Sequence, residues 1–584
     1  MKLEWDLTHL YKNFNEWQSD YILLKEKLDS LKEIVIDSSQ SVNNLISYLD
    51  LAIEVNILIE KTFCYAKRHV DLDSTLEEFK SMMNDVLKLY SDFQNISNRF
   101  ENLLIENKDR VLKFLEDKNI NKYKRYLSLI LRRADHIIIK EDFNFSSKMQ
   151  TLKDSYRELV NEKIEFKTIN IDGEEVLVNR KNFENLMVND SQENRKKAFD
   201  TYNQSFIELV NPIFDIYKRK LLLDINYAKE EKYESLLSKK LFELELDEKI
   251  VSNLIETINN NLEIMHKYIE LKKSITGIED YHLYDTAISI CNIPKIEYEF
   301  QDALEIIKNS LTILGDDYTK VIDKMFEEGW VDVYPQNNKR SMSFTAISYV
   351  GVPYILLNYN KSINSLKTTA HEIGHGYNVY ASKMANDFIY FECSYFLTEI
   401  ASKVNELLVS EYMLNSSLLL EEKKYILNAL ISNLGNSLFD QVMFTEFEDK
   451  IISHLSLNDI SVDEINNLYL SLMKKYYGNA LIYDENVKYG WLKIPHFVMQ
   501  DTYYMYQYSI GMAIATSIVY RLLNDKDNFV LKYKKFLSVG NSISISEALK
   551  IIDINLEDNT YLLNAIDFLN DNIEKMKKLV KENC

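Results

Sequence analysis

Glycine and proline are scarce in this chain of 584 residues, which contains 12 Gly and 5 Pro. Proteins made of many short strands need these residues at their turns. Their scarcity argues against such an architecture and predicts a mainly α-helical fold. A chain of this length can form a large core and usually divides into more than one lobe.

Cysteine and long apolar runs are also lacking. The four cysteines lie far apart and form no Cys-x-x-Cys pair, so they indicate neither a disulfide framework nor a thiolate zinc site. The sequence shows no run of about 18 apolar residues, and its beginning, Met1-Lys-Leu-Glu-Trp-Asp-Leu, has no apolar segment typical of a secretion signal. We therefore expect a soluble cytoplasmic protein that does not bind a membrane.

Basic residues are outnumbered by acidic ones. The chain has 69 Lys and Arg against 90 Asp and Glu, which gives a formal net charge of -21. Such a charge disfavours contact with a polyanion, so nucleic acid is not an expected partner. Nothing in the sequence indicates an obligatory protein partner either.

Apolar residues at helical spacing are the dominant pattern in the sequence. Through about residue 165, apolar residues recur at steps of three and four, which predicts amphipathic helices of a bundle. Residues 166–178 instead alternate and contain Asp172-Gly173, which predicts a small hairpin. Helical spacing then resumes. We place an N-terminal helical lobe at residues 1–170 and a second region at residues 171–584.

The second region contains the segment Lys367-Thr-Thr-Ala-His371-Glu372-Ile-Gly-His375-Gly. On a helix, His371 and His375 project from one face, close enough for both imidazoles to hold one metal ion. Two imidazoles suit zinc, and Glu372 beside them could take a proton from a water molecule that attacks a carbonyl. The alternative is a surface helix that carries these residues by chance.

Catalytic zinc usually has three protein ligands, so a third is expected. Glu399 is the first candidate, because the 24 residues after His375 allow one helix to end and another to return beside it. Glu406, seven positions further, could accept a hydrogen bond from a ligand imidazole. Either acid could instead be a solvated helical charge.

These motifs resemble the thimet oligopeptidase and oligoendopeptidase F family of zinc peptidases. The shared pattern is His-Glu-x-Gly-His, here residues 371–375, followed by a Glu within Thr398-Glu-Ile-Ala-Ser-Lys-Val-Asn-Glu406. Ile494-Pro-His496-Phe and Tyr503-Tyr-Met-Tyr506-Gln-Tyr-Ser-Ile-Gly511 look like the family's segment that contacts substrate. The chain departs from many relatives at Met342, where they have Gly nearby, and at Asn378, where they often have His.

The resemblance implies a two-lobed helical zincin-type metallopeptidase with a deep substrate channel and one zinc ion per chain. The zinc site would lie within residues 371–406 and the substrate-contact segment within residues 490–511. His496 and Tyr506 would then hydrogen-bond substrate or the developing oxyanion, with Tyr503 and Tyr504 nearby. A tyrosine-rich helical segment is otherwise usually core, and that alternative stays open.

Residues 340–359 form a second strand-like region, just before the motif. Two extended runs interrupted by Gly351-Val-Pro predict a small sheet beside the motif helix. Its edge, with Gly351 as a substrate contact, could pair with an extended peptide, or the chain itself could cover it.

We therefore predict a zinc metalloendopeptidase that hydrolyses internal bonds of short, unstructured peptides. A helical peptide-binding protein with a purely structural zinc site is one alternative, and a metallohydrolase of non-peptide amides is another. Glu372 distinguishes the first, because a structural site needs no general base.

Overall fold

The computed structural model describes residues 1–136, 143–291, 296–416 and 418–581 and is helical over most of them. Its contacts divide the chain into two units. Unit 1 consists of residues 1–137, 296–412 and 518–554, and unit 2 consists of residues 138–295, 413–517 and 555–584. The mainly helical class predicted from the sequence is confirmed. The division near residue 170 stays a prediction.

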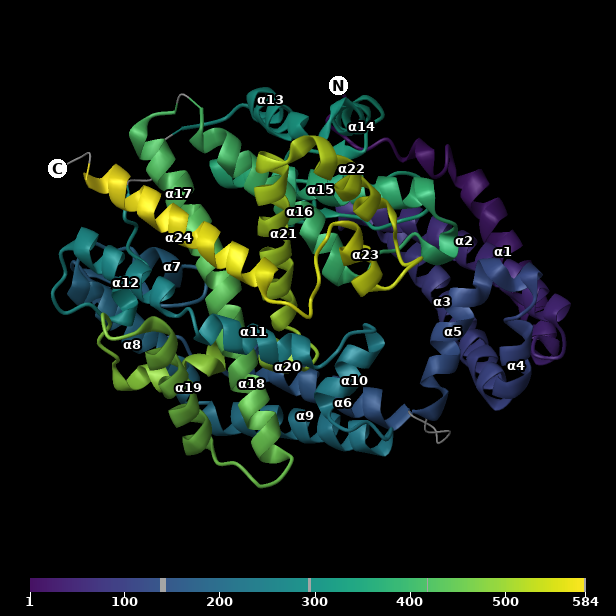
Figure 1. Ribbon diagram of the computed structural model, residues 1–584, viewed down its shortest axis with the longest axis horizontal. Helices are drawn as coiled ribbons and strands as arrows, with labels where there is room; N and C mark the ends of the chain where they lie inside the picture. The colour runs from purple at the N-terminus through teal and green to yellow at the C-terminus, as the bar shows by residue number, and fades with distance from the viewer. Residues whose placement is uncertain (137–142, 292–295, 417, 582–584) are drawn as a thin grey trace. The chain divides into compact units, whose positions relative to one another are not determined.

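Unit 1 begins with helices that pack against one another, α1, α2 and α3 (Figure 1). Asn13 and Ser41 cap the starts of α1 and α2 by accepting hydrogen bonds from backbone N–H groups in the first turn. The helices assigned to unit 1 are α1 (Phe14–Ile34), α2 (Val42–Leu72), α3 (Glu77–Glu106), α4 (Lys108–Phe114), α5 (Lys124–Arg132), α13 (Phe300–Leu311), α14 (Asp316–Glu327), α15 (Ile363–Ala385), most of α16 (Tyr395–Leu414), α22 (Lys526–Ser538) and α23 (Ile545–Ile551).

A small sheet precedes α15 in unit 1. Its order is β3 (Val331–Asp332), β5 (Ile355–Leu356) and β4 (Phe344–Thr345), with β3 parallel and β4 antiparallel to β5. Thr345 pairs with Ile355, which makes β4 an edge strand of this sheet among the described residues. The predicted sheet beside the motif helix is therefore present.

Unit 2 carries the predicted hairpin, β1 (Thr168–Ile171) and β2 (Glu174–Leu177), with positive φ at Asp172 and Gly173. Positive φ at both central residues is the geometry that Asp-Gly favours in a tight hairpin. The helices assigned to unit 2 are α6 (Phe143–Glu158), α7 (Phe183–Met187), α8 (Gln192–Ile207), α9 (Val210–Glu230), α10 (Leu236–Glu243), α11 (Lys249–Asn259), α12 (Glu263–Thr276), α17 (Leu420–Gly435), α18 (Gln441–Leu455), α19 (Val462–Tyr477), α20 (His496–Met499), most of α21 (Tyr506–Asn524) and α24 (Thr560–Lys581).

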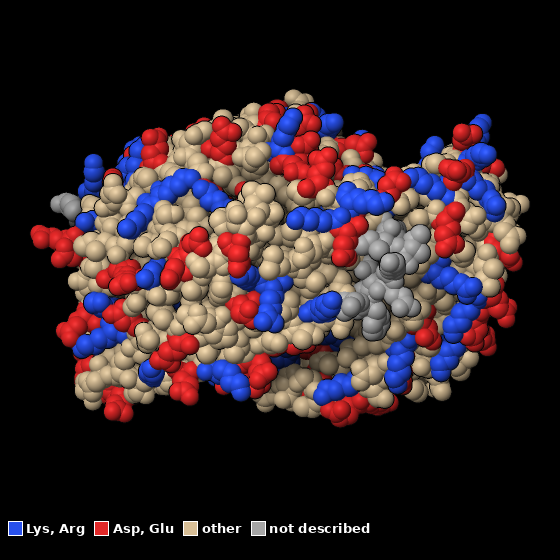
Figure 2. Space-filling model, turned by 90° about the horizontal axis from the view of Figure 1, so that it is seen from below, with Lys and Arg blue, Asp and Glu red and all other residues tan. Residues whose placement is uncertain are grey.

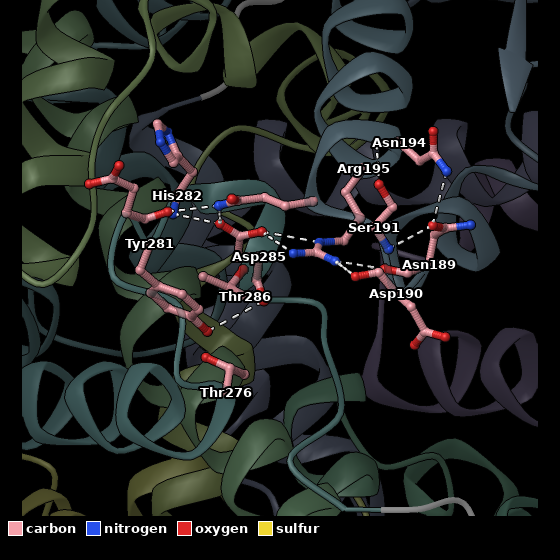
Figure 3. A network of polar contacts seen from close by, with 12 residues as sticks. Asn189, Asp190, Ser191, Asn194, Arg195, Thr276, Tyr281, His282, Asp285 and Thr286 are labelled. Carbon is pink, nitrogen blue, oxygen red and sulfur yellow. Dashed lines mark hydrogen bonds and ion pairs between the residues drawn. The ribbon is translucent and has the colours of Figure 1, made fainter. Parts of the chain in front are cut away.

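A buried ion pair organises one part of unit 2 (Figure 3). Arg195 of α8 donates to Asp285 at 2.6 and 3.1 Å and to the carbonyls of Asn189 and Asp190 at 2.7 and 3.0 Å. Both charged side chains are almost fully buried, and Asp285 also accepts from the backbone of His282. Because a buried charge without its partner is strongly destabilising, this network fixes α8 against the segment around Asp285.

The α2 helix is long and apolar enough to cross a membrane by length and composition, which the search for a continuous apolar run did not reveal. One such helix is weak evidence for a membrane span, since core helices of soluble proteins pass the same test, and α2 contacts both α1 and α3. The cytoplasmic location stays a prediction. On the face of the molecule drawn in Figure 2, acidic and basic side chains are interspersed, without a continuous basic area.

Candidate active site

The α15 helix presents the two histidines of the motif in unit 1. Ser362 caps the helix by accepting from the backbone of Ser365, and the helix continues to Ala385. His371 and His375 lie one turn apart, and their Nε2 atoms are 3.1 Å apart. The two imidazoles therefore converge on one point, as the sequence spacing predicts.

Gly374 lets α16 approach α15 closely. A Cβ atom at this position would lie 2.7 Å from Cα of Ser402 and 2.8 Å from the carbonyl oxygen of Ala401. Asn405 of α16 also donates to the carbonyl of Ala370 at 3.1 Å. The glycine between the two histidines thus sets the distance between the helices.

This approach brings Glu399 of α16 to the histidines. Its carboxylate oxygens lie 3.6 Å from Nε2 of His375 and 4.0 Å from Nε2 of His371. The three potential ligand atoms lie within 4.8 Å of one another. A tetrahedral zinc ion with bonds of about 2.0–2.1 Å holds its ligand atoms about 3.3 Å apart, so this donor set fits zinc after a small adjustment of Glu399.

Glu406 lies on the other side of His371. Because a carboxylate can only accept, Nδ1 of His371 must donate to Glu406, which leaves Nε2 as the coordinating nitrogen. Burial alone would lower the pKa of His371, but the bond and charge of Glu406 outweigh it and raise the pKa. For Glu406, burial opposes ionisation, yet His371 and Lys403 lower its pKa to about 2.

At His375, the effects that lower the pKa prevail. Burial and the neighbouring His371 lower the pKa of His375 to about 3. The imidazole of His375 is therefore neutral at pH 7, which is the form that binds a metal ion.

Glu372 is buried on α15, and its carboxylate accepts a 2.7 Å hydrogen bond from the hydroxyl of Thr345 on strand β4. Burial raises the pKa of Glu372 above its ordinary value, although this hydrogen bond acts in the opposite direction. A carboxylate with a raised pKa is a better proton acceptor. Sequence reasoning missed Thr345, and only the register of β4 beside the motif helix could have indicated it.

The loop after β4 contains Gly351, which has a φ of 62° and whose carbonyl accepts from Lys383 of α15 at 2.6 Å. Glu60 of α2 holds the preceding residues by accepting from the hydroxyl of Ser348 and the backbone of Tyr349, both at 2.6 Å. The loop is thus tied to two helices of unit 1.

His496 and the predicted tyrosines belong to unit 2. The ring of His496 makes an edge contact with Tyr508 at 6.2 Å between centroids, and Tyr508 makes another with Tyr504 at 5.4 Å. These side chains are half-buried. Tyr508 was not among the predicted site residues, because its spacing of four residues from Tyr504 does not by itself distinguish a site residue from a core tyrosine.

Tyr503 and Tyr506 are buried instead, at 3% and 1% exposed. Tyr503 has a φ of 60°, and its backbone N–H donates to Glu448 at 2.7 Å while its hydroxyl donates to Asp449 at 2.8 Å. The hydroxyl of Tyr506 has no hydrogen-bond partner in the described part of the chain. A buried hydroxyl without a partner is unusual and marks this position for a test.

The profile of peptidase family M3 matches residues 185–568. The chain belongs to peptidase family M3. It is 30% identical to an oligoendopeptidase F homolog of Borreliella burgdorferi, over 99% of this chain and 98% of that protein. It is 27% identical to oligopeptidase PepF of Bacillus subtilis, over 99% and 87%.

Solved structures agree with this assignment. A crystal structure of a Chlamydophila abortus protein matches this M3 chain with a TM-score of 0.91 and 25% identity, covering 99% of this chain and 98% of that one. Oligoendopeptidase-F from Enterococcus faecium matches with a TM-score of 0.73 and 21% identity, over 97% and 99%. The predicted family, its fold and its assignment as a metalloendopeptidase are confirmed.

Proposed function

We propose that this M3 peptidase is a zinc-dependent endopeptidase that cleaves internal bonds of short oligopeptides. The observation that carries the proposal is the convergence of His371, His375 and Glu399 beside the buried Glu372. The names of the relatives, oligoendopeptidase F and oligopeptidase, support the substrate class.

His371, His375 and Glu399 would hold the ion, and Glu406 orients the first of them. When bound, zinc supplies Lewis acidity and makes a nearby water more acidic. Glu372 accepts a proton from the water molecule while the oxygen of that water adds to the scissile carbonyl carbon. Glu372 then delivers that proton to the leaving amine as the carbon–nitrogen bond breaks.

The hydrogen bond from Thr345 orients the Glu372 carboxylate for this transfer. Strand β4, which carries Thr345, is an edge strand, and its free side suits pairing with an extended peptide backbone. His496, with Tyr504, Tyr506 and Tyr508 as candidate donors, would hydrogen-bond the substrate or the negative charge that develops on the carbonyl oxygen. We further propose that such substrates reach the site through a channel.

A purely structural zinc site would fill its fourth position with a protein ligand. The metal-binding group found among the described residues has three members, and Glu372 stands beside it, so the catalytic reading is favoured. Hydrolysis of non-peptide amides would make no use of the edge strand.

The direct test is digestion of a mixed peptide library, with cut sites read by mass spectrometry. We expect internal cleavage that stops after a chelator and returns with one equivalent of zinc. Glu372→Gln protein at equal zinc content is the matched control. Cleavage that persists in metal-free protein would contradict the proposal.

A further inference from the structure

Unit 1 contains a cavity of about 800 Å³. Helices α2 and α3 form much of its wall, and residues 388–394 before α16 close another side. This volume falls within the range of about 300–1,000 Å³ for ligand pockets. The cavity can therefore hold a segment of peptide.

The wall of the cavity combines polar groups with apolar side chains, and some of the apolar side chains are exposed. Leu87 and Tyr90 of α3 and Ile347 after β4 line it and are 41%, 38% and 42% exposed. The 18-residue stretch of α2 that is apolar enough to cross a membrane is only 28% buried. Many residues of α2 line this cavity. The apolar surface of these helices thus faces a space large enough for a ligand.

The charges in the wall have one sign. Glu60 and Glu392 line the cavity, and its described lining includes no Lys, Arg or His. Glu60 already accepts hydrogen bonds from the loop at Ser348 and Tyr349. Glu392 is exposed to the cavity, and among the described residues it has no hydrogen-bond or ion-pair partner. Although part of the side chain is exposed, desolvation by the neighbouring residues raises the pKa of Glu392.

Two residues of the cavity wall are close in sequence to residues of the proposed chemistry. Ile347 follows Thr345 by two residues, a distance of about 7 Å along an extended chain. Ser394 lines the cavity immediately before α16, the helix that carries Glu399. A peptide lying along β4 can therefore place a side chain in this space.

We propose that the cavity binds a lysine or arginine side chain of the peptide substrate, with Glu392 facing its cationic end. The methylene stem would lie against the exposed apolar side chains of the wall, and the ring of Tyr90, which is 38% exposed, offers a face to the cation. An acidic end group would be repelled. This inference rests on the proposed endopeptidase function and names its preferred substrates.

The test uses a peptide that the zinc-loaded protein cleaves at one bond. Lys, Arg, Glu or norleucine is placed in turn at each of several positions on both sides of that bond, and kcat/KM is measured. At one position we expect the basic residues to exceed norleucine by about tenfold. Glu392→Gln should bring this ratio close to one, and Glu392→Lys should favour a glutamate there. Glu106→Gln, an exposed acid of α3 outside the cavity, should keep the wild-type ratio.

An unchanged ratio in Glu392→Gln protein of equal zinc content would overturn the inference, as would equal cleavage of all peptides by the wild type. Failure of the wild type to cleave any peptide would instead overturn the proposed function. Binding of the protein to phosphatidylcholine vesicles that is lost in Leu87→Asp protein would assign the apolar wall to a membrane and also overturn the inference.

Discussion

Different surroundings set the chemistry of the two acids around His371. Glu406 accepts from the imidazole and is held ionised, whereas Glu372 accepts from Thr345 and has a raised pKa. The same residue type therefore has two roles, because one carboxylate faces a cationic partner and the other faces a neutral hydroxyl in a buried position.

Glu372→Gln keeps the size of the side chain but removes the proton acceptor. We expect the variant to fold and to retain zinc while kcat/KM for peptide hydrolysis falls by several orders of magnitude. The zinc content of each protein is measured by inductively coupled plasma mass spectrometry on the sample that is used for the kinetics. Near wild-type turnover at full zinc content would rule out Glu372 as the base.

The tyrosines of unit 2 can be separated by paired substitutions. If Tyr506 donates to the oxyanion, Tyr506→Phe should lower kcat about 10²- to 10³-fold with little change in KM. If Tyr508 beside His496 is the donor, Tyr508→Phe should have this effect. Tyr506→Phe should then leave kcat within a few-fold and alter only the thermal stability. Both variants are compared with wild type at equal zinc content, and wild-type kcat in both would exclude both residues.

At the scale of elements, the approach of α15 to α16 depends on Gly374. Gly374→Ala would place a methyl group against the backbone of Ser402, so the helices must separate. We expect the steric conflict to lower the free energy of unfolding by about 1–3 kcal/mol, while the higher helix propensity of Ala offsets about 1 kcal/mol of this loss. Zinc should also bind more weakly, because Glu399 moves away from the histidines.

Gly511 of α21 is the matched control for this prediction. A Cβ atom there has no neighbour within 4 Å among the described residues, so Gly511→Ala should be neutral or stabilising by up to about 1 kcal/mol. Denaturant unfolding and zinc titration of both variants test the comparison. Equal effects of the two substitutions would show that helix propensity, and not the contact between α15 and α16, determines the change in stability.

The elements themselves could be predicted where the signal is local. Periodicity indicated the helices, Asp172-Gly173 indicated the hairpin, and the spacing of His371 and His375 indicated the shared face. Thr345 and Tyr508 could not be found in this way with certainty. The role of Thr345 depends on the register of β4, which involves residues outside its own stretch of sequence. The role of Tyr508 depends on ring packing near the start of α21, which periodicity does not locate.

Each of the two units is assembled from three separate stretches of chain. Local patterns do not reveal such an assembly, because the contacts that create it join residues hundreds of positions apart. A consequence within unit 2 is that some ionisable groups lie where desolvation raises their pKa. Asp440 is one of them, since it lies between α17 and α18 and accepts from the hydroxyl of Tyr477 at 2.7 Å.

Asp440 makes the stability of the protein depend on pH. Burial raises its pKa from 3.8 to about 7 in the folded protein. The folded state thus retains a proton that the unfolded chain has already released. Its contribution to stability is fully present below pH 4 and is lost as the pH rises to about 7. Buried Glu448, whose pKa is also about 7, adds to the same trend.

Asp440→Asn keeps an oxygen that can accept from Tyr477 but cannot ionise. We expect this variant to match the wild type near pH 4 and to be more stable by about 2–4 kcal/mol at pH 8. Asp567→Asn, an exposed aspartate of α24, should show no such difference between the two pH values. Calorimetry of the three proteins from pH 4 to pH 8 provides the measurement. A constant difference between Asp440→Asn and wild type across this range would mean that Asp440 stays ionised in the folded protein, stabilised by its contact with Tyr477.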